Sequence, residues 1–277
     1  MLFKKIYIEI TNVCNFHCSF CFEASRSKTF MSVENFRFVA QKVKLATDYV
    51  YLHVLGEPLL HPYFDEILKI CAESNLNVNI STNGSLLKKQ KEILLKNSVR
   101  QINISLHDAE ENIPKEKWAE FILEMLQISN ELSSKTYLNL RLWNQTNAAS
   151  VEFNQFCYGL MREFYHLPAD FTFSSEGERN ITLAPNIYLQ NAPRFEWQTE
   201  NAVENKTCYA LKDHVAVLAN GDVVPCCIDA EANLRLGNIF NDDLQQIIQS
   251  EKAMQIKNGF ANHKAVEDFC KKCGFRI

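Results

Sequence analysis

Three cysteines near the N-terminus have the spacing of a metal-binding loop. Cys14, Cys18 and Cys21 stand at C-x3-C-x2-C, directly after the apolar, β-branched run Lys5–Ile10, which predicts a strand. Thiolates are soft ligands that select iron–sulfur clusters, zinc or Cu(I). Because a structural zinc site needs four ligands, three thiolates favour a cubane cluster with one iron open to a small molecule. Three unrelated buried thiols are the alternative, and the close spacing beside a strand argues against it.

A second group of cysteines lies in the last quarter of the chain: Cys208, Cys226, Cys227, Cys270 and Cys273. Asn220-Gly221 stands between two short apolar runs and predicts a type I′ β-hairpin, which would bring Cys208 and Cys226 together. Cys270 and Cys273 form a C-x2-C turn that completes the set. Four thiolates would saturate a 4Fe–4S cluster, and a hairpin followed by C-x2-C also suits a zinc ribbon.

The elements that must position these groups alternate between strands and helices. Strands are predicted over Lys5–Ile10, Tyr49–Leu55, Asn77–Ser81, Gln101–Leu106, Tyr137–Leu142 and Phe171–Phe173, with amphipathic helices between them. Such alternation predicts an α/β fold with a parallel sheet and helices outside. Because six strands are too few for the closed eight-stranded barrel, we expect an open, partial (β/α)6 TIM-like barrel. Sites in such folds lie at the carboxyl ends of the strands.

The regular pattern ends near residue 175, which predicts three parts. Residues 1–175 would form the partial barrel. Residues 176–206, rich in Ser, Glu, Asn and Pro, would form a connector. Residues 207–277 would form a small cysteine-rich domain, built from the hairpin and a helix over about 244–257.

Composition excludes several classes of partner and location. The 277 residues are 47% hydrophobic and carry a net charge of −4, which argues against a nucleic-acid partner or an anionic membrane surface. No uninterrupted apolar run is long enough to span a membrane, and the N-terminus lacks the features of a signal peptide. Clustered cysteines without a signal sequence indicate a reducing compartment, so we expect a cytoplasmic protein.

The first cysteine motif, with Phe20 directly before its third cysteine, resembles the cluster loop of the radical S-adenosylmethionine (SAM) superfamily. The resemblance implies a 4Fe–4S cluster on Cys14, Cys18 and Cys21 whose open iron binds the amino and carboxylate groups of SAM. One electron then cleaves SAM to methionine and a 5′-deoxyadenosyl radical, which takes a hydrogen atom from the substrate. It also implies a reducing partner such as flavodoxin or ferredoxin.

The same resemblance assigns candidate SAM contacts, which are Phe20, Gly56, Glu57, Thr82, Asn83, Ser105 and Arg141. Phe20 would touch adenine, and Gly56-Glu57 matches the family's Gly-Glu-Pro motif, whose usual preceding glycine is Leu55 here. Ser105 would contact the ribose or the methionine end, and Arg141 would pair with the SAM carboxylate. The structural alternatives are that Glu57 starts a turn and that Arg141 pairs with a surface acid.

The second cysteine group resembles the SPASM/Twitch extension of radical SAM enzymes, in the form with a single auxiliary cluster. This implies an auxiliary 4Fe–4S cluster on Cys208, Cys226, Cys270 and Cys273, with zinc as the alternative. Because neighbours on an extended strand point to opposite faces, Cys227 is expected to be a core or substrate-facing thiol.

No motif encodes the substrate. The resemblance therefore leaves three readings open: an oxidoreductase acting on a small molecule, a maturase acting on a peptide or protein side chain, and a non-catalytic iron–sulfur or zinc scaffold. A net oxidation assisted by the auxiliary cluster is expected for an enzyme of this kind.

Overall fold

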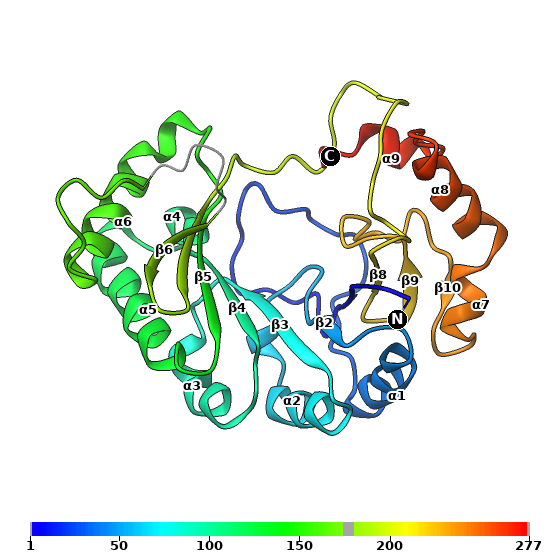
Figure 1. The fold of residues 1–277 in the computed structure, drawn as a ribbon, viewed down its shortest axis with the longest axis horizontal. Coiled ribbons are helices and arrows are strands. Elements are labelled where there is room, and N and C mark those ends of the chain that lie inside the picture. The colour runs from blue at the N-terminus through cyan, green and yellow to red at the C-terminus, as the bar shows by residue number, and fades with distance from the viewer. Residues whose placement is uncertain (1, 174–179, 276–277) are drawn as a thin grey trace. The chain divides into compact units, whose positions relative to one another are not determined.

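A computed structural model describes residues 2–173 and 180–275. The chain divides into two compact units (Figure 1). The first unit contains residues 1–14, 22–78 and 195–277, and the second contains residues 15–21 and 79–194. The strands form a mixed sheet that does not close on itself. The predicted α/β class is therefore confirmed.

The first unit contains strands in the order β10-β9-β8-β1-β2. Their bounds are Lys5–Ile8 for β1, Tyr49–Tyr51 for β2, His214–Val217 for β8, Asp222–Val224 for β9 and Gly237–Asn238 for β10. Strand β1 is parallel to both β2 and β8, whereas β8, β9 and β10 pair antiparallel. Along β1, Ile6 and Ile8 are fully buried, while Lys5 and Tyr7 on the other face are half-buried. This alternation is what a strand with one apolar face requires.

The helices of the first unit are α1 (Val33–Lys44), α2 (Phe64–Glu73), α7 (Leu244–Ile248), α8 (Glu251–Ala261) and α9 (Asp268–Lys272), with the 3-10 turn η1 (Pro58–Leu60). Helix α1 begins where the sequence indicates, because the Ser32 Oγ accepts a hydrogen bond from the Asn35 N–H at 3.1 Å. The helix predicted over 244–257 is instead two helices, and the Ser250 Oγ caps the second through the Ala253 N–H at 3.4 Å.

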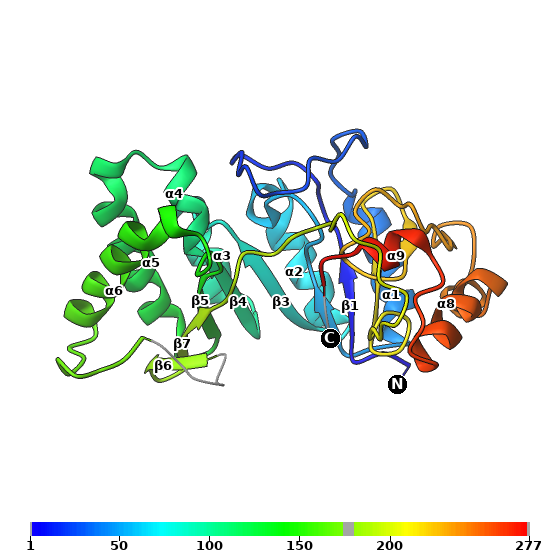
Figure 2. The same ribbon diagram turned by 90° about the horizontal axis from the view of Figure 1, so that it is seen from above.

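The second unit contains strands in the order β3-β4-β5-β7-β6. Their bounds are Asn77–Thr82 for β3, Gln101–Ser105 for β4, Tyr137–Leu142 for β5, Asn180–Ala184 for β6 and Ile187–Asn191 for β7. The pairs β3–β4, β4–β5 and β5–β7 are parallel, and only β6 runs antiparallel to its neighbour among the described strands of this unit. Helices α3 (Leu87–Lys96), α4 (Ala109–Asn112), α5 (Trp118–Leu132) and α6 (Val151–Phe164) follow these strands, and Figure 2 shows α5 and α6 along one side of β5. Three 3-10 turns, η2 (Leu106–Asp108), η3 (Lys115–Lys117) and η4 (Ala148–Ser150), lie at helix starts.

The strand predicted over Phe171–Phe173 is wrong, because this segment forms no strand. Its aromatic rings pack locally instead: Phe173 stacks on Tyr158 with ring centroids 4.6 Å apart, and Phe171 meets Phe173 edge-on. The sixth parallel position of the sheet belongs to β7, within the segment predicted as a connector. The short apolar patch Ile187–Leu189 was the sequence signal for it. Residues 176–179 of that connector lie outside the described residues.

The β8–β9 hairpin is confirmed, but its predicted type I′ turn is wrong. Leu218 N–H donates to Asp222 O and Gly221 N–H donates to Leu218 O, each at 2.8 Å. Gly221 has a φ of +87°, whereas Asn220 is absent from the positive-φ residues. The turn is therefore a three-residue loop with one left-handed glycine.

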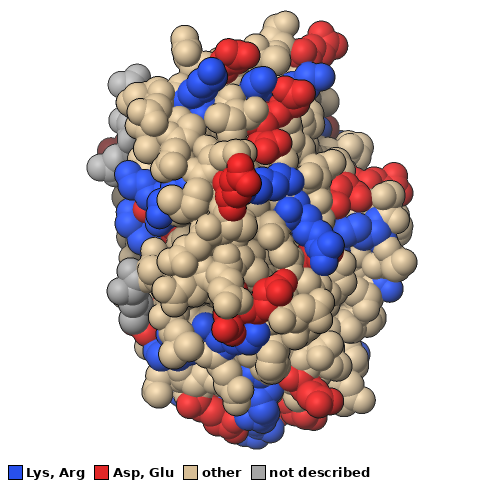
Figure 3. Space-filling view, turned by 90° about the vertical axis from the view of Figure 1, so that its right-hand side faces the viewer, with Lys and Arg blue, Asp and Glu red and all other residues tan. Residues whose placement is uncertain are grey.

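The described helices include none that is both long and apolar enough to cross a membrane. On the face of the molecule in Figure 3, basic and acidic side chains lie interspersed among other residues.

Candidate functional site

The cluster loop, residues 14–21, is closed at its base by backbone and side-chain hydrogen bonds within the first unit. The Asn12 side chain donates to Ser27 O at 3.0 Å and accepts from the Thr29 N–H at 2.8 Å. The Thr11 Oγ1 donates to Thr29 O at 2.8 Å and accepts from the Val13 N–H at 3.0 Å. Asn12 and Thr11 are buried, so the two ends of the loop are held together by residues shielded from water.

Gly56 and Glu57 pack directly against this base. A Cβ atom on Gly56 would lie 2.6 Å from Thr11 O and 2.8 Å from Val13 O, and Gly56 has a φ of +76°. Only glycine combines this backbone conformation with so close an approach. The Glu57 N–H donates to Val13 O at 2.8 Å, and the buried Glu57 carboxylate accepts from the Leu59 N–H at 2.9 Å. The structure thus gives the Gly-Glu-Pro segment a supporting role beneath the loop, and Glu57 also starts the turn η1.

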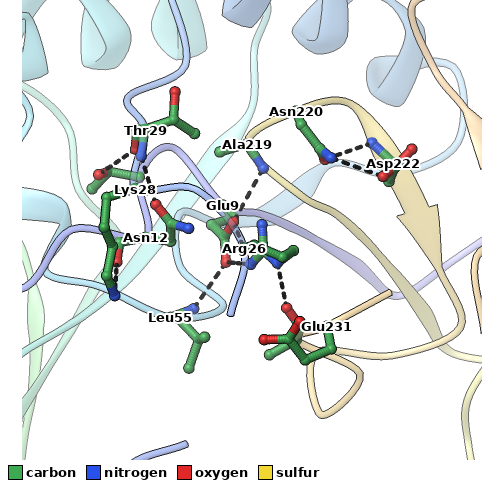
Figure 4. Close-up of polar contacts among 12 residues, drawn as sticks. Glu9, Asn12, Arg26, Lys28, Thr29, Leu55, Ala219, Asn220, Asp222 and Glu231 are labelled. Carbon is green, nitrogen blue, oxygen red and sulfur yellow. Dashed lines mark hydrogen bonds and ion pairs between the residues drawn. The ribbon is translucent and has the colours of Figure 1, made fainter. Parts of the chain in front are cut away.

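A buried ion pair ties the segment after the third cysteine to the C-terminal part of the first unit. Glu9 is fully buried, and its carboxylate accepts two hydrogen bonds of 2.9 Å from the Arg26 Nη2. It also accepts from the backbone N–H groups of Leu55 and Ala219 at 3.3 and 3.2 Å (Figure 4). Arg26 additionally donates through Nε to the carbonyl of Ala230.

The neighbouring Ser25 strengthens the same connection. Its backbone N–H and its Oγ both donate to the carboxylate of Glu231, the Oγ at 2.9 Å. Residues 25 and 26 are therefore anchored to residues 230 and 231, although more than 200 residues separate them in the sequence.

The middle of the cluster loop is held by the end of helix α4 within the second unit. The Asn112 Oδ1 accepts from the His17 N–H at 2.8 Å, and its Nδ2 donates to the Cys18 Sγ at 3.3 Å. Glu111 accepts from the Ser19 N–H at 2.6 Å and from the Ser19 Oγ at 2.8 Å. Burial raises the pKa of the Cys18 thiol, and the Asn112 hydrogen bond opposes that rise.

Phe20 lies between two polar groups of the second unit. Its ring centroid is 5.5 Å from that of His107, and the Arg194 guanidinium carbon lies 4.7 Å from it. His107 is buried, which lowers its pKa to about 4. Its Nδ1 lies 3.0 Å from Arg141 O and 3.4 Å from the Trp143 N, and its Nε2 lies 3.3 Å from the Asp108 Oδ1. Phe20 is half-buried, and its predicted contact with adenine stays a prediction.

Thr82 and Asn83 form the turn that follows β3. The Thr82 Oγ1 accepts from the Gly84 N–H at 3.0 Å, and the Asn83 Oδ1 accepts from the Ser85 N–H at 3.0 Å. The Asn83 Nδ2 donates to the Asn15 Oδ1 at 3.1 Å, which adds another link to the cluster loop. Both residues thus stabilise the turn and the loop in this structure.

Ser105 and Arg141 are paired in register at the carboxyl ends of β4 and β5. The Arg141 Nη1 donates to the Ser81 Oγ at 3.1 Å, its Nε donates to the Gln190 Oε1 at 3.2 Å, and its guanidinium lies 4.3 Å from the Trp143 ring centroid. The predicted alternative, an ion pair with a surface acid, stays a prediction.

The auxiliary cysteines lie in turns of the first unit. The Cys208 Sγ accepts from the Ala210 N–H at 3.5 Å, and the Cys273 Sγ accepts from the Phe275 N–H at 3.4 Å. Backbone hydrogen bonds from residues 228 and 229 favour the thiolate of Cys226 in the same way. Lys206 holds the C-x2-C turn, because its ammonium donates to the carbonyls of Cys270 and Cys273.

The thiols of this group are close enough for their charges to interact. Burial raises the pKa of Cys226 and of Cys208, and it raises the pKa of Cys270 to about 12. Interactions with Cys208 raise the pKa of Cys226 and Cys270 further, and Cys273 acts on both Cys208 and Cys270. Cys208 therefore interacts with Cys226, Cys270 and Cys273.

Cys227 has different surroundings from the other four. Burial raises the pKa of Cys227 to about 11. A hydrogen bond with the Tyr7 side chain lowers this pKa, and the charge of Lys5 lowers it to a smaller extent. Tyr7 in turn lies 5.1 Å from Tyr51, measured between ring centroids. Cys227 also accepts a backbone N–H group, and its charge interacts with Cys208 and Cys226, so its Tyr7 partner is what sets it apart.

The donor chemistry of both cysteine groups fits thiolate ligation. No set of three or more His, Cys, Asp or Glu side chains forms a metal-binding group within residues 2–173 and 180–275. Backbone N–H groups directed at sulfur nevertheless prepare Cys208, Cys226 and Cys273 to carry negative charge. Four such thiolates suit an iron–sulfur cluster and zinc alike.

Sequence reasoning missed several residues that shape these sites: Glu9, Arg26, Glu111, Asn112, Arg194 and Lys206. Glu9 had a signal, because it stands on the same face of the first strand as Lys5 and Tyr7, opposite the buried isoleucines. The others had none, since their partners are distant in the sequence.

Two family models match the chain. The first, described as the radical SAM superfamily, matches residues 8–140, and the second, described as the SPASM iron–sulfur cluster-binding domain, matches residues 208–274. Among curated proteins, a probable GTP 3′,8-cyclase of Pyrobaculum aerophilum is 28% identical over 107 residues. That match covers 38% of this chain and 34% of the relative, so the chain spans only about a third of that protein.

Solved structures share the fold over nearly the whole chain. BtrN in complex with AdoMet and 2-DOIA has a TM-score of 0.64 at 17% identity, covering 99% of this chain and 94% of that one. Streptococcus suis SuiB bound to precursor peptide SuiA has a TM-score of 0.61 at 18% identity, covering 99% of this chain and 70% of that one. These likenesses confirm the open, partial-barrel fold that the sequence predicts.

Proposed function

Because the chain belongs to the radical SAM superfamily, we propose that it cleaves SAM reductively with a 4Fe–4S cluster held by Cys14, Cys18 and Cys21. When bound, the cluster supplies the electron that converts SAM to methionine and a 5′-deoxyadenosyl radical. The observation that carries the proposal is the loop itself, closed at its base by Thr11 and Asn12 and presenting three cysteines at C-x3-C-x2-C. A reductant such as flavodoxin or ferredoxin would supply the electron.

We further propose roles for the predicted SAM contacts. Phe20 would cover the adenine, and Ser105 would hydrogen-bond the ribose or the methionine end. Gly56 and Glu57 would receive the methionine amino group, for which the backbone carbonyls suit better than the Glu57 carboxylate, because that carboxylate already caps η1.

The remaining contacts would act on the other end of SAM and on the loop. Arg141, at the carboxyl end of β5, would bind the SAM carboxylate through a charge-assisted hydrogen bond. Thr82 and Asn83 would act through the turn that they stabilise.

SAM cleavage by anaerobically reconstituted protein with a strong reductant tests the first proposal. Replacing Cys14, Cys18 and Cys21 together with alanine should abolish 5′-deoxyadenosine formation, because no thiolate remains to hold the cluster that binds SAM. Cys71→Ala, at a buried thiol far from both motifs in the sequence, is the matched control and should keep cleavage. Unchanged cleavage by the triple variant would refute the assignment.

For the auxiliary site we propose a second 4Fe–4S cluster on Cys208, Cys226, Cys270 and Cys273. Four thiolates leave no open iron, so this cluster would accept an electron rather than bind substrate. Hydrogen abstraction followed by loss of one electron is a net two-electron oxidation. The backbone N–H groups aimed at three of these sulfurs support ligation.

Metal analysis separates the auxiliary proposal from its alternatives. Replacing the four cysteines with alanine should lower bound iron from roughly eight to roughly four atoms per chain, while uncoupled SAM cleavage partly survives. Cys227→Ala should keep the full iron content. Zinc bound at these thiols, or full substrate turnover without them, would argue for a structural cap or scaffold instead.

A small polar molecule is the substrate class that we propose. Polar side chains on the neighbouring strands β3, β4 and β5 are hydrogen-bonded to one another. The Asn139 Nδ2 donates to the Asn103 Oδ1 at 3.0 Å, and both Asn103 and Arg141 donate to the Ser81 Oγ. The chain also spans 94% of BtrN, whose structure contains 2-DOIA, against 70% of the peptide-bound SuiB.

Peptide or protein side-chain modification is the second candidate, favoured by the SuiB likeness. Formation of 5′-deoxyadenosine above the uncoupled rate, measured with panels of aminocyclitols and of short peptides, distinguishes the two. Stimulation by peptides alone would reject the small-molecule proposal.

A further inference from the structure

Asn112 is fixed against the cluster loop in one orientation. Its Oδ1 accepts from the His17 N–H at 2.8 Å, and its Nδ2 donates to Asp108 O at 2.9 Å and to the Cys18 Sγ at 3.3 Å. The His17 N–H is a donor and Asp108 O is an acceptor, so turning the amide over would set donor against donor and acceptor against acceptor. The NH2 group is therefore the end that faces sulfur.

The surrounding contacts hold the backbone on both sides of Cys18. His17 is bound by Asn112, and Ser19 is bound twice by Glu111 at 2.6 and 2.8 Å. The Arg194 Nη2 lies 3.6 Å from the Glu111 Oε1 and its guanidinium covers the Phe20 ring. The backbone on both sides of Cys18 is thus held by hydrogen bonds to α4, which also carries the amide that faces its sulfur.

A hydrogen bond to a ligating sulfur changes the reduction potential of an iron–sulfur cluster. Reduction adds negative charge, part of which resides on the sulfurs, and a donor at sulfur stabilises that charge. Removing the donor therefore favours the oxidised cluster and lowers the reduction potential.

We propose that Asn112 is a positioning residue that raises the reduction potential of the cluster held by Cys18 through its N–H···S hydrogen bond. This inference rests on the proposed function of the cluster loop. Asn112 touches a cluster ligand rather than the reacting atoms, and it makes the cluster easier for a biological donor to reduce.

The test is a redox titration of the full, reconstituted protein followed by electron paramagnetic resonance. The signal that changes on adding SAM identifies the cluster of Cys14, Cys18 and Cys21, and the unresponsive signal of the auxiliary cluster is an internal reference. Asn112→Leu removes the donor at similar size. Asn112→Asp keeps an oxygen for the His17 N–H and places negative charge beside sulfur.

Both variants should lower the potential of the SAM-responsive cluster and leave the auxiliary one unchanged. The expected shift is about tenfold in the ratio of reduced to oxidised cluster, which is about 59 mV for one electron. Asn112→Asp should shift it at least as far as Asn112→Leu. Asn97→Leu is the control: Asn97 is the half-buried C-cap of α3, where its Nδ2 donates to Ile93 O at 2.9 Å, and its replacement should leave both potentials unchanged.

Two results would overturn the inference. A wild-type potential in both Asn112 variants, at unchanged iron content, would show that the hydrogen bond does not act on the cluster. The absence of any SAM-responsive signal in the wild-type protein would reject the proposed function, and this inference with it.

Discussion

Replacing Glu9 with alanine is expected to destabilise the protein more than any exposed ion pair does. Glu9 is fully buried, and the Arg26 side chain is only 12% exposed. The alanine variant would leave the guanidinium without its carboxylate and would remove the acceptor of the Leu55 and Ala219 N–H groups. Breaking a buried ion pair by removing one partner costs about 3–5 kcal/mol.

Glutamine should be a poor substitute for Glu9. The carboxylate accepts from the Arg26 Nη2 and from the N–H groups of Leu55 and Ala219, which are all donors. A glutamine side chain offers one acceptor oxygen and one donor group, so its NH2 would face another donor. We therefore expect Glu9→Gln to cost about 3 kcal/mol.

A double-mutant cycle separates the pair from its surroundings. Because Glu9→Ala and Arg26→Ala each abolish the same ion pair, the double variant should lose less stability than the two single losses added, with a coupling of about 1–3 kcal/mol. Glu73→Ala is the matched control. Glu73→Ala removes an ion pair in which the Arg37 side chain is 51% exposed and the Glu73 side chain 59% exposed. Its loss should lower the free energy of unfolding by less than about 1 kcal/mol.

Urea unfolding followed by circular dichroism measures these differences. With an m-value of about 3 kcal/mol per molar urea, the midpoint of Glu9→Ala should fall by about 1–1.7 M. The reasoning would be refuted if Glu9→Ala moved the midpoint no further than Glu73→Ala, or if the coupling with Arg26 were zero.

Three further changes have defined outcomes. Gly56→Ala should lower both the stability of the protein and the iron content of the first cluster, because its Cβ would lie 2.6 Å from Thr11 O. The control Gly159→Ala in α6 has no atom within 4 Å of the added Cβ and should stabilise the protein by about 0.5–1 kcal/mol. Iron analysis and urea midpoints measure both effects. Burial lowers the pKa of His61, whose neutral ring has its Nε2 2.9 Å from Met31 O and accepts from the Tyr63 N–H at Nδ1. Below about pH 6.5 the unfolded state therefore binds more protons than the folded state, and the protein loses stability as the pH is lowered. His61→Gln should flatten that pH dependence in urea midpoints between pH 7 and 5, while exposed His263→Gln should not. Ser32→Ala removes the N-cap of α1 and should lower the free energy of unfolding by about 1 kcal/mol in the same assay. An unchanged urea midpoint would mean that the cap is dispensable.

Much of the fold could be predicted because its signals are local. The predicted helices between the strands are present because α1, α2 and α6 each carry an apolar stripe in the sequence, and α1 also has the capping residue Ser32. The strand at Phe171–Phe173 failed because a three-residue aromatic run fits local ring packing as well as a strand. Strand β7 was missed because only Ile187 and Leu189 mark its buried face.

The turn between β8 and β9 shows where local signals stop. Asn-Gly predicted a hairpin at the right place, and Gly221 has the positive φ that the pair suggests. The Asn220 side chain instead accepts from the Asp222 N–H and donates to the Asp222 carboxylate. Which residues of a turn adopt positive φ thus depended on these contacts.

By itself the sequence determined the chemistry of the protein, because thiolate spacing is a property of neighbouring residues. C-x3-C-x2-C in one loop and C-x2-C near the end predict two ligand groups wherever the chain places them. The tertiary structure decided what surrounds those thiols. Asn112 beside Cys18, Tyr7 beside Cys227 and Arg26 against Glu9 each join different elements of the chain, and such contacts arise only when the sheet brings distant strands and loops together.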